Sequence, residues 1–365
     1  RIWVCFVLAV LSPYASAQTS IRAEYHAPTN LFAVMDETAY WYPGFNNSEH
    51  REAWTERFGW SREDQAIANR YKRYRKRTFD DSDQTDAATR LKQDGIFITR
   101  SSIAPEADPL GAHFFRSATI EDALTNLESI MSASDAEMLR SFYAHFRPKW
   151  QSLLDESEAF ASQAAELDIE LTSADISTFL RRVSAFYSVD DDLEFTMRLV
   201  WWPPVRRTFA YAKGQTFLLY RHPVMHIGES DRADIAIHEA VHYISAHQTF
   251  EQKRTLSERF LEGCPVAVSA NQYDLLEEPL AIAWGQIAFA KYVRGEQLDL
   301  SDSLYSRALP DLMAKLIWLE IDAIYESDET ISDGLIDTAA KHCAAVLETS
   351  KALRQKSRWF GWLQR

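Results

Sequence analysis

The spacing of apolar residues changes twice along the chain. Most of the chain carries apolar residues three and four positions apart, which is the spacing of helices that bury one side. Residues 193–200 instead alternate between apolar and polar positions, and residues 208–212 and 215–220 flank Lys213-Gly214 as the arms of a hairpin would. The helical spacing returns at residue 235. We therefore expect an α+β protein that is mostly α, with a helical first half, then a small sheet, one helix directly after it, and further helices in the rest of the chain.

Individual helices are expected wherever the helical spacing is continuous. They cover residues 48–74, 119–131, 134–147, 149–166, 173–187, 251–262, 275–293, 302–326 and 331–350. Residues 95–99 have the composition of a short strand. The change of pattern near residue 190 separates a helical region of residues 18–190, whose role the sequence does not indicate, from a region of residues 191–365 that holds the sheet.

The helix expected after the sheet contains the motif His-Glu-x-x-His. Its two histidines, His238 and His242, are four residues apart and so project from the same side of the helix, where both imidazoles can bind one metal ion. Glu239 follows the first histidine, and its carboxylate can reach a metal-bound water without being a ligand. With zinc, such a site activates water for attack on a carbonyl.

The alternative is a chance match, in which a core helix carries two buried, hydrogen-bonded histidines. Residues 235, 237, 240, 241 and 244 are apolar, so most of the helix circumference is apolar. Burying two imidazoles beside such a surface is costly without a strong partner. This cost favours the metal site.

The overall charge narrows the choice of partners. The chain has 365 residues and a formal net charge of −14. This balance argues against nucleic acid or an anionic membrane surface as the main partner. The basic stretch 70–77 contains interleaved tyrosines, and we expect it to be a solvated helix side paired with acids such as Asp80, Asp81 and Asp83 rather than a phosphate site.

The first 17 residues have the order of a secretory signal peptide. Arg1 is followed by an apolar run over residues 2–11, then Pro13 and the small-residue site Ala15-Ser16-Ala17. The run is too short for a spanning helix, although an N-terminal anchor is the alternative. We expect a secreted or periplasmic protein that starts near Gln18 and keeps no integral membrane segment.

The cysteines leave one question open. Cys5 would be removed with the signal peptide, so the mature chain keeps Cys264 and Cys343. In an oxidising compartment these two could form a disulfide, or they could be two buried thiols.

A small sheet, a His-Glu-x-x-His helix and a later helix with an acid resemble the catalytic core of zincin metallopeptidases. The best match is the gluzincin, thermolysin-like branch, and the resemblance covers about residues 193–350. It implies a zinc site in which a glutamate on the later helix is the third ligand. Glu278, which follows His242 by 36 residues (278 − 242), is the preferred ligand over Glu277, because Asp274 and Glu277 have the spacing of a capping pair.

One position departs from the family. Gluzincins place an Asp four residues after the ligand Glu, where it accepts a hydrogen bond from the first His, and here that position is Ile282. Another residue must then support the histidines. The candidates are Gln286, Asn271 and Asp274.

The resemblance also implies a side chain that stabilises the oxyanion of the transition state. His342 corresponds in position, and Tyr273 and Tyr305 are the alternatives. In the family the edge strand before the motif helix binds the substrate backbone, which implicates residues 215–220. His222 and His226 lie near that strand, and we interpret them as loop histidines.

The first functional hypothesis is therefore an exported zinc metallopeptidase that hydrolyses peptide or protein substrates, with one Zn²⁺ bound by His238, His242 and Glu278 and with Glu239 as general base. The alternatives are a non-catalytic, zinc-stabilised binding protein and a zinc hydrolase acting on another bond.

The aromatic segment 358–362 is expected to dock on the body of the protein, with a membrane surface or a partner as the alternative. The sequence does not indicate the oligomeric state.

Overall fold

The computed structural model describes residues 19–41, 47–78, 108–225, 233–265, 267, 275–327 and 329–363. Helices account for 68% of the structure and strands for 8%, which confirms the expected α+β, mostly α class. The signal peptide expected over residues 1–17 and the strand expected over residues 95–99 lie outside the described residues.

Four strands form one sheet in the order β1-β2-β4-β3. They are β1 (Ser20–Glu24), β2 (Glu194–Trp201), β3 (Phe209–Lys213) and β4 (Thr216–Arg221). β2 runs parallel to β1 and to β4, whereas β3 runs antiparallel to β4. Gly214, with φ of 60°, forms the turn between β3 and β4, because glycine enters this left-handed region without strain. The hairpin predicted around Lys213-Gly214 is thus confirmed.

Two features of the sheet differ from the sequence expectation. β1 comes from the helical first half and pairs with β2, so a boundary near residue 190 would divide the sheet. Among the described strands, β1 and β3 occupy the two edges, and β4 lies between β2 and β3. Residues 215–220 are therefore not the edge strand, as expected above, and Phe209–Lys213 takes that place.

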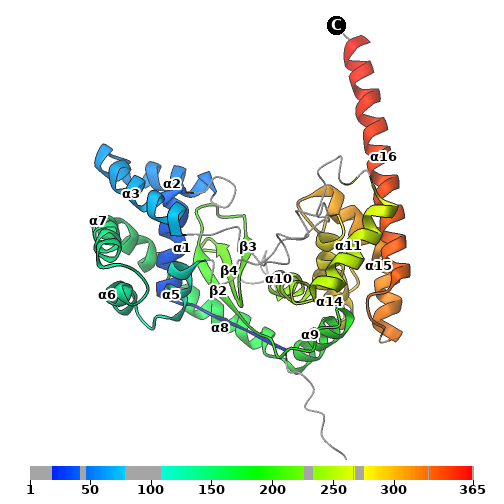
Figure 1. The fold of residues 1–365 in the computed structure, drawn as a ribbon, viewed down its shortest axis with the longest axis horizontal. Helices are drawn as coiled ribbons and strands as arrows, with labels where there is room; N and C mark the ends of the chain where they lie inside the picture. Colours follow the sequence, from blue (N-terminus) through cyan, green and yellow to red (C-terminus); the bar gives the residue numbers. More distant parts are fainter. Residues whose placement is uncertain are drawn as a thin grey trace, which may run out of the picture.

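Helices cover both faces of the sheet (Figure 1). On one face lie α1 (Ala27–Ala39) and α2 (Ser48–Phe58), and Arg198 of β2 donates a hydrogen bond to Thr29 of α1. On the other face lies α10 (Ala233–Ala246), where the Tyr243 ring packs on Phe195 and Phe217. This second face carries the motif helix.

The remaining helices of the first half surround α1 and support β1. They are α3 (Arg62–Thr78), α5 (Pro109–Arg116), α6 (Ile120–Thr125), the 3-10 turn η2 (Asn126–Ser129), α7 (Ala133–Ser157), α8 (Phe160–Leu171) and α9 (Ala174–Phe186). Helix α7 continues through Pro148, although two helices were predicted on either side of this residue. α7 buries Phe142, Phe146 and Trp150 around that point, and this tertiary packing outweighs the local cost of proline.

The basic stretch 70–77 is only partly a solvated helix side. Arg75 is fully buried and forms ion pairs with Asp36 of α1 and with Asp108, which caps α5. Arg77 pairs with Asp135 at the surface, and Asp80, Asp81 and Asp83 lie outside the described residues. Arg75 thus joins three helices of the first half.

After α10 the described chain is helical. Its elements are α11 (Phe250–Gly263), α13 (Glu277–Ile282), the π-helix η3 (Ala283–Ala288), α14 (Phe289–Tyr292), α15 (Ala308–Ser327) and α16 (Asp333–Leu363). Cys264 at the end of α11 and Cys343 of α16 form a disulfide with a Cα–Cα distance of 5.9 Å, which answers the question that the sequence left open.

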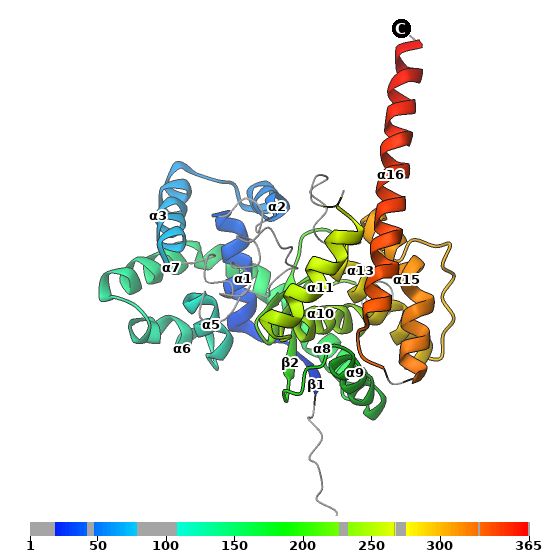
Figure 2. The ribbon, with the colours of Figure 1, turned by 45° about the vertical axis from the view of Figure 1, so that its right-hand side comes forward.

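Helix α16 is longer than the predicted residues 331–350. Its first half packs on α11 and α15, and its far end extends away from the rest of the molecule (Figure 2). Among the described residues, no helix combines the length and the apolar character that crossing a membrane requires.

Candidate metal centre

Helix α10 positions the two histidines of the motif in the interior. Ile237, Val241 and Ile244 are fully buried in the core and fix the rotation of the helix. His238 and His242 project one turn apart, and their Nε2 atoms face each other at 3.0 Å. The predicted helix and the shared orientation of the two imidazoles are therefore confirmed.

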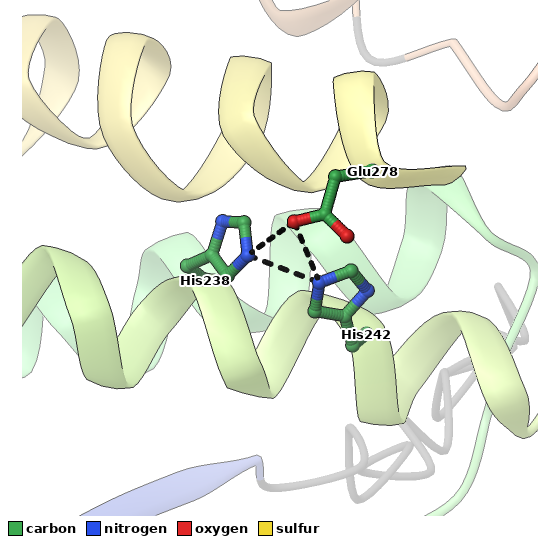
Figure 3. A group of neighbouring side chains, drawn as sticks. All are labelled: His238, His242 and Glu278. Atoms are coloured by element: carbon green, nitrogen blue, oxygen red, sulfur yellow. Dashed lines mark hydrogen bonds and ion pairs between the residues drawn. The ribbon is translucent and has the colours of Figure 1, made fainter. Parts of the chain in front are cut away.

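Glu278 of α13 completes a group of three potential ligands. Its Oε1 atom lies 3.4 Å from His238 Nε2 and 3.8 Å from His242 Nε2 (Figure 3). Ligand atoms about 2.0–2.2 Å from a shared tetrahedral ion lie about 3.3–3.6 Å from one another. The three separations bracket this range, so the buried group His238, His242 and Glu278 could hold a metal ion.

The burial of this group also fits a cation. The exposed fractions of His238, His242 and Glu278 are 5%, 4% and 1%. Glu278 Oε1 is buried and faces both imidazoles, but it forms no hydrogen bond of good geometry among the described residues. A cation bound between the three atoms would satisfy this oxygen, so the ligand arrangement suits a metal.

Electrostatics favours a charged carboxylate at Glu278. Burial alone would raise its pKa, but the adjacent imidazoles of His238 and His242 outweigh burial and hold the pKa of Glu278 well below its usual range. For His242, burial acts to lower the pKa, whereas Glu277 and Glu278 raise it well above its usual value. The carboxylate of Glu278 is therefore charged, which suits a bound cation.

Glu277 supports His242 from the side opposite the ligand atoms. Its carboxylate accepts a hydrogen bond from Nδ1 of His242. Since Nδ1 then carries the proton, Nε2 keeps its lone pair for a metal. The expected use of Glu277 as a helix cap is not observed, because α13 begins after Leu276 without a side-chain cap.

Of the three sequence candidates for this supporting role, only Gln286 lies among the described residues, and no described contact gives it that role. Gln286 lies in η3, and its Oε1 atom has no hydrogen-bond partner in the described part of the chain. Asn271 and Asp274 lie outside the described residues. The sequence did not predict that Glu277 supports His242, because this second acid next to the ligand was interpreted as a helix cap.

A glycine lets the helix that carries Glu278 come close to α10. A Cβ atom added at Gly285 of η3 would lie 2.5 Å from His238 Cα and 2.8 Å from His238 N. Only glycine therefore allows this contact of η3 with α10. Sequence analysis did not identify Gly285, although Ala281, Gly285 and Ala288 are small residues at helical spacing.

Tyr305, one of the alternatives for the oxyanion role, lies beside the ligand group. Its ring stacks on His238 with a centroid distance of 5.7 Å. The backbone N–H groups of Leu304 and Tyr305 donate to Oδ1 of Asp311, which holds this loop on α15. Tyr305 is therefore positioned by a defined anchor.

His342 is not brought to the ligand group. It is half-buried on α16, the helix that packs on α11 and α15. In the described structure it makes no hydrogen bond, ion pair or ring contact with His238, His242 or Glu278. Tyr273, the third alternative, lies outside the described residues.

Three other residues were singled out in the sequence, and the structure describes two of them. Glu239 is buried in α10 directly after His238. His222 follows β4 in a loop, where its Nδ1 accepts the Val224 N–H, in agreement with a loop histidine. His226 lies outside the described residues.

Comparison with known proteins assigns no family to this arrangement. No model of a protein family, no curated protein and no solved structure matches the chain. What the chain itself provides is a buried group of two histidines and one glutamate that could hold a metal ion.

Proposed function

We propose that the protein is an exported zinc metallopeptidase of the gluzincin type. The observation that carries this proposal is the separation of the three ligand atoms, 3.0, 3.4 and 3.8 Å, on His238, His242 and Glu278. Glu239 adds a buried carboxylate next to His238. Two imidazoles, one carboxylate and one adjacent acid are the side chains that hydrolytic zinc sites use.

Zinc is the metal we propose because the ligand set suits it. Two imidazole nitrogens and one carboxylate oxygen at tetrahedral separations match a catalytic zinc site that keeps a fourth position open. Bound zinc would polarise the scissile carbonyl and lower the pKa of an attacking water.

The protein itself would transfer the protons, stabilise the oxyanion and bind the substrate backbone. Glu239 would accept the proton of the attacking water and return it to the leaving nitrogen. Tyr305 is the side chain we propose for stabilising the developing oxyanion, because its ring stacks on His238 while His342 has no contact with the group. β3, the edge strand that lies beside α10, would pair with the substrate backbone.

Two observations support export. The first 17 residues have the pattern of a signal peptide. The disulfide between Cys264 and Cys343 fits an oxidising compartment, such as the periplasm or the extracellular space.

The test is a pair of isosteric substitutions assayed on a peptide library. Glu239→Gln is expected to keep about one zinc per chain and to lose cleavage, because only the proton acceptor is removed. The matched control is Glu258→Gln on α11, where an exposed acid is changed in the same way. Unchanged cleavage by Glu239→Gln would exclude the proposed role of this residue.

A second candidate is a zinc site that only stabilises the fold. The near-complete burial of all three ligand side chains favours it. In that case no peptide is cut, and removing zinc with a chelator lowers the melting temperature strongly. Cleavage together with a stable apo protein would exclude this candidate.

A further inference from the structure

The last part of α16 differs in charge from the rest of the protein. Residues 349–365 contain no acid and five basic residues, which are Lys351, Arg354, Lys356, Arg358 and Arg365. Without these five positive charges, the formal net charge of −14 becomes −19 for the rest of the chain. A net charge summed over the whole chain therefore hides a basic segment.

The same segment is rich in large apolar residues at helical spacing. Leu353, Phe360 and Leu363 follow one another at intervals of seven and three, which places them on one side of a helix. Lys351, Arg354 and Arg358 follow at intervals of three and four, about half a turn away. Lys356 is the exception, because its spacing places it between Leu353 and Phe360, and Trp362 lies among the basic residues. Since α16 is helical to Leu363, the sequence pattern is that of a basic amphipathic helix.

The backbone of this segment runs away from the rest of the molecule. The start of α16 is fixed to the body by the Cys264–Cys343 disulfide and by packing on α11 and α15. Its far end stands clear of the other helices in both views (Figures 1 and 2). The docking on the body that the sequence suggested for residues 358–362 is not observed.

We infer that residues 351–363 bind the surface of an anionic lipid bilayer. A helix with several Lys or Arg residues on one side and Trp, Phe and Leu residues elsewhere lies in the plane of a membrane interface. Trp359 and Trp362 belong to the residue type that is enriched at that depth. The acidic body would be repelled by the same surface, so it would face away from the lipid.

The experiment is flotation of the full-length protein with lipid vesicles. One set contains phosphatidylcholine alone, and in the other about a third of the lipid is phosphatidylglycerol. The protein is expected to float with the anionic vesicles only, and high salt is expected to weaken this binding because the attraction is screened.

Two variants locate the contact. Arg354→Glu with Arg358→Glu should weaken binding at least about 25-fold, because each of the two basic residues near an anionic surface contributes about fivefold. The matched control reverses two exposed basic residues of α3, Arg73→Glu with Lys76→Glu, and should bind as the unaltered protein does. Trp359→Ser with Phe360→Ser keeps the charge and should also weaken binding.

Three results would overturn the inference. The first is no flotation with anionic vesicles. The second is an equal loss of vesicle binding in the α3 control, which would show that binding depends on the total charge and not on this segment. The third is a dimer in solution that the segment variants abolish without any lipid binding, because the segment would then bind a second copy of the chain. If the charge-reversed variant does not fold, the aromatic variant decides alone. Zinc content, which depends on α10 and α13, is expected to be unchanged throughout.

Discussion

The carboxylate of Glu277 accepts a hydrogen bond from Nδ1 of His242 in the interior of the protein. The neighbouring residue, Glu278, approaches Nε2 of the same imidazole from the other side at 3.8 Å. The carboxylates of two consecutive glutamates thus approach the two ring nitrogens of one histidine. One of them sets the tautomer and the other would share the metal.

Glu277→Gln is expected to weaken zinc binding about 10–100-fold, which is the usual cost of losing such a supporting partner. Glu278→Gln removes a charged ligand and should weaken binding more. Competition with a chromogenic chelator measures both. Glu258→Gln serves as the control, because this exposed acid of α11 takes no part in the group. Equal affinities for Glu277→Gln and the unaltered protein would show that the hydrogen bond does not tune the site.

Local patterns predicted the elements that depend on neighbours in sequence. The α10 helix, the β3–β4 hairpin at Gly214 and the shared direction of His238 and His242 all follow from spacing over a few residues. Glu278 was found by its distance from the motif in a resembling family, and the structure brings it to the histidines.

The features that the sequence did not predict depend on contacts between distant segments. Ser20 of β1 pairs with Glu194 of β2, and parallel pairing over such a distance leaves no local signal. The choice between Tyr305 and His342 depends on how α15 and α16 pack, not on their distance from the motif. The helix break predicted at Pro148 was wrong for the same reason, because tertiary packing decides whether a helix continues.

Gly285→Ala is expected to damage both the fold and the metal group. The new methyl group would meet the backbone of His238 at 2.5 Å, so η3 would have to move away from α10 and carry Glu278 with it. Overpacking of this kind costs about 1–3 kcal/mol. Thermal unfolding and zinc content measure the two effects.

The control is Gly334→Ala near the start of α16, where the nearest atom to an added Cβ is Ser332 Oγ at 3.8 Å. This variant should change stability by less than about 1 kcal/mol and keep its zinc. If Gly285→Ala behaved in the same way, the close contact would not position Glu278.

Tyr305→Phe is expected to lower kcat on a cleaved peptide while zinc content and KM stay nearly constant. The ring that stacks on His238 is kept, and only the hydroxyl that would stabilise the oxyanion is lost. The loss should be about 10²–10³-fold if the hydroxyl is the main donor. His342→Ala on α16 is the comparison and should leave kcat unchanged. The reverse pattern would restore His342 as the oxyanion side chain.

His50 should make the stability of the protein depend on pH below neutrality. It is buried among the rings of Trp201, Trp202 and Tyr220, and neither ring nitrogen has a hydrogen-bond partner among the described residues. Burial lowers the pKa of His50 from 6.5 to about 3. The folded protein therefore keeps this imidazole neutral at a pH where the unfolded chain binds a proton.

Because only the unfolded chain binds this proton, stability falls as the pH falls. The contribution of His50 to the free energy of unfolding is complete above about pH 6.5 and is lost progressively as the pH falls towards about 3. Between pH 6.5 and pH 5 the loss amounts to about 2 kcal/mol. His50→Phe removes the titrating group and keeps an aromatic ring. Urea unfolding at both pH values, with chelator present so that the metal group does not contribute, should show a smaller pH dependence for His50→Phe by this amount. Equal pH dependence in the two proteins would mean that His50 is protonated without cost in the folded state.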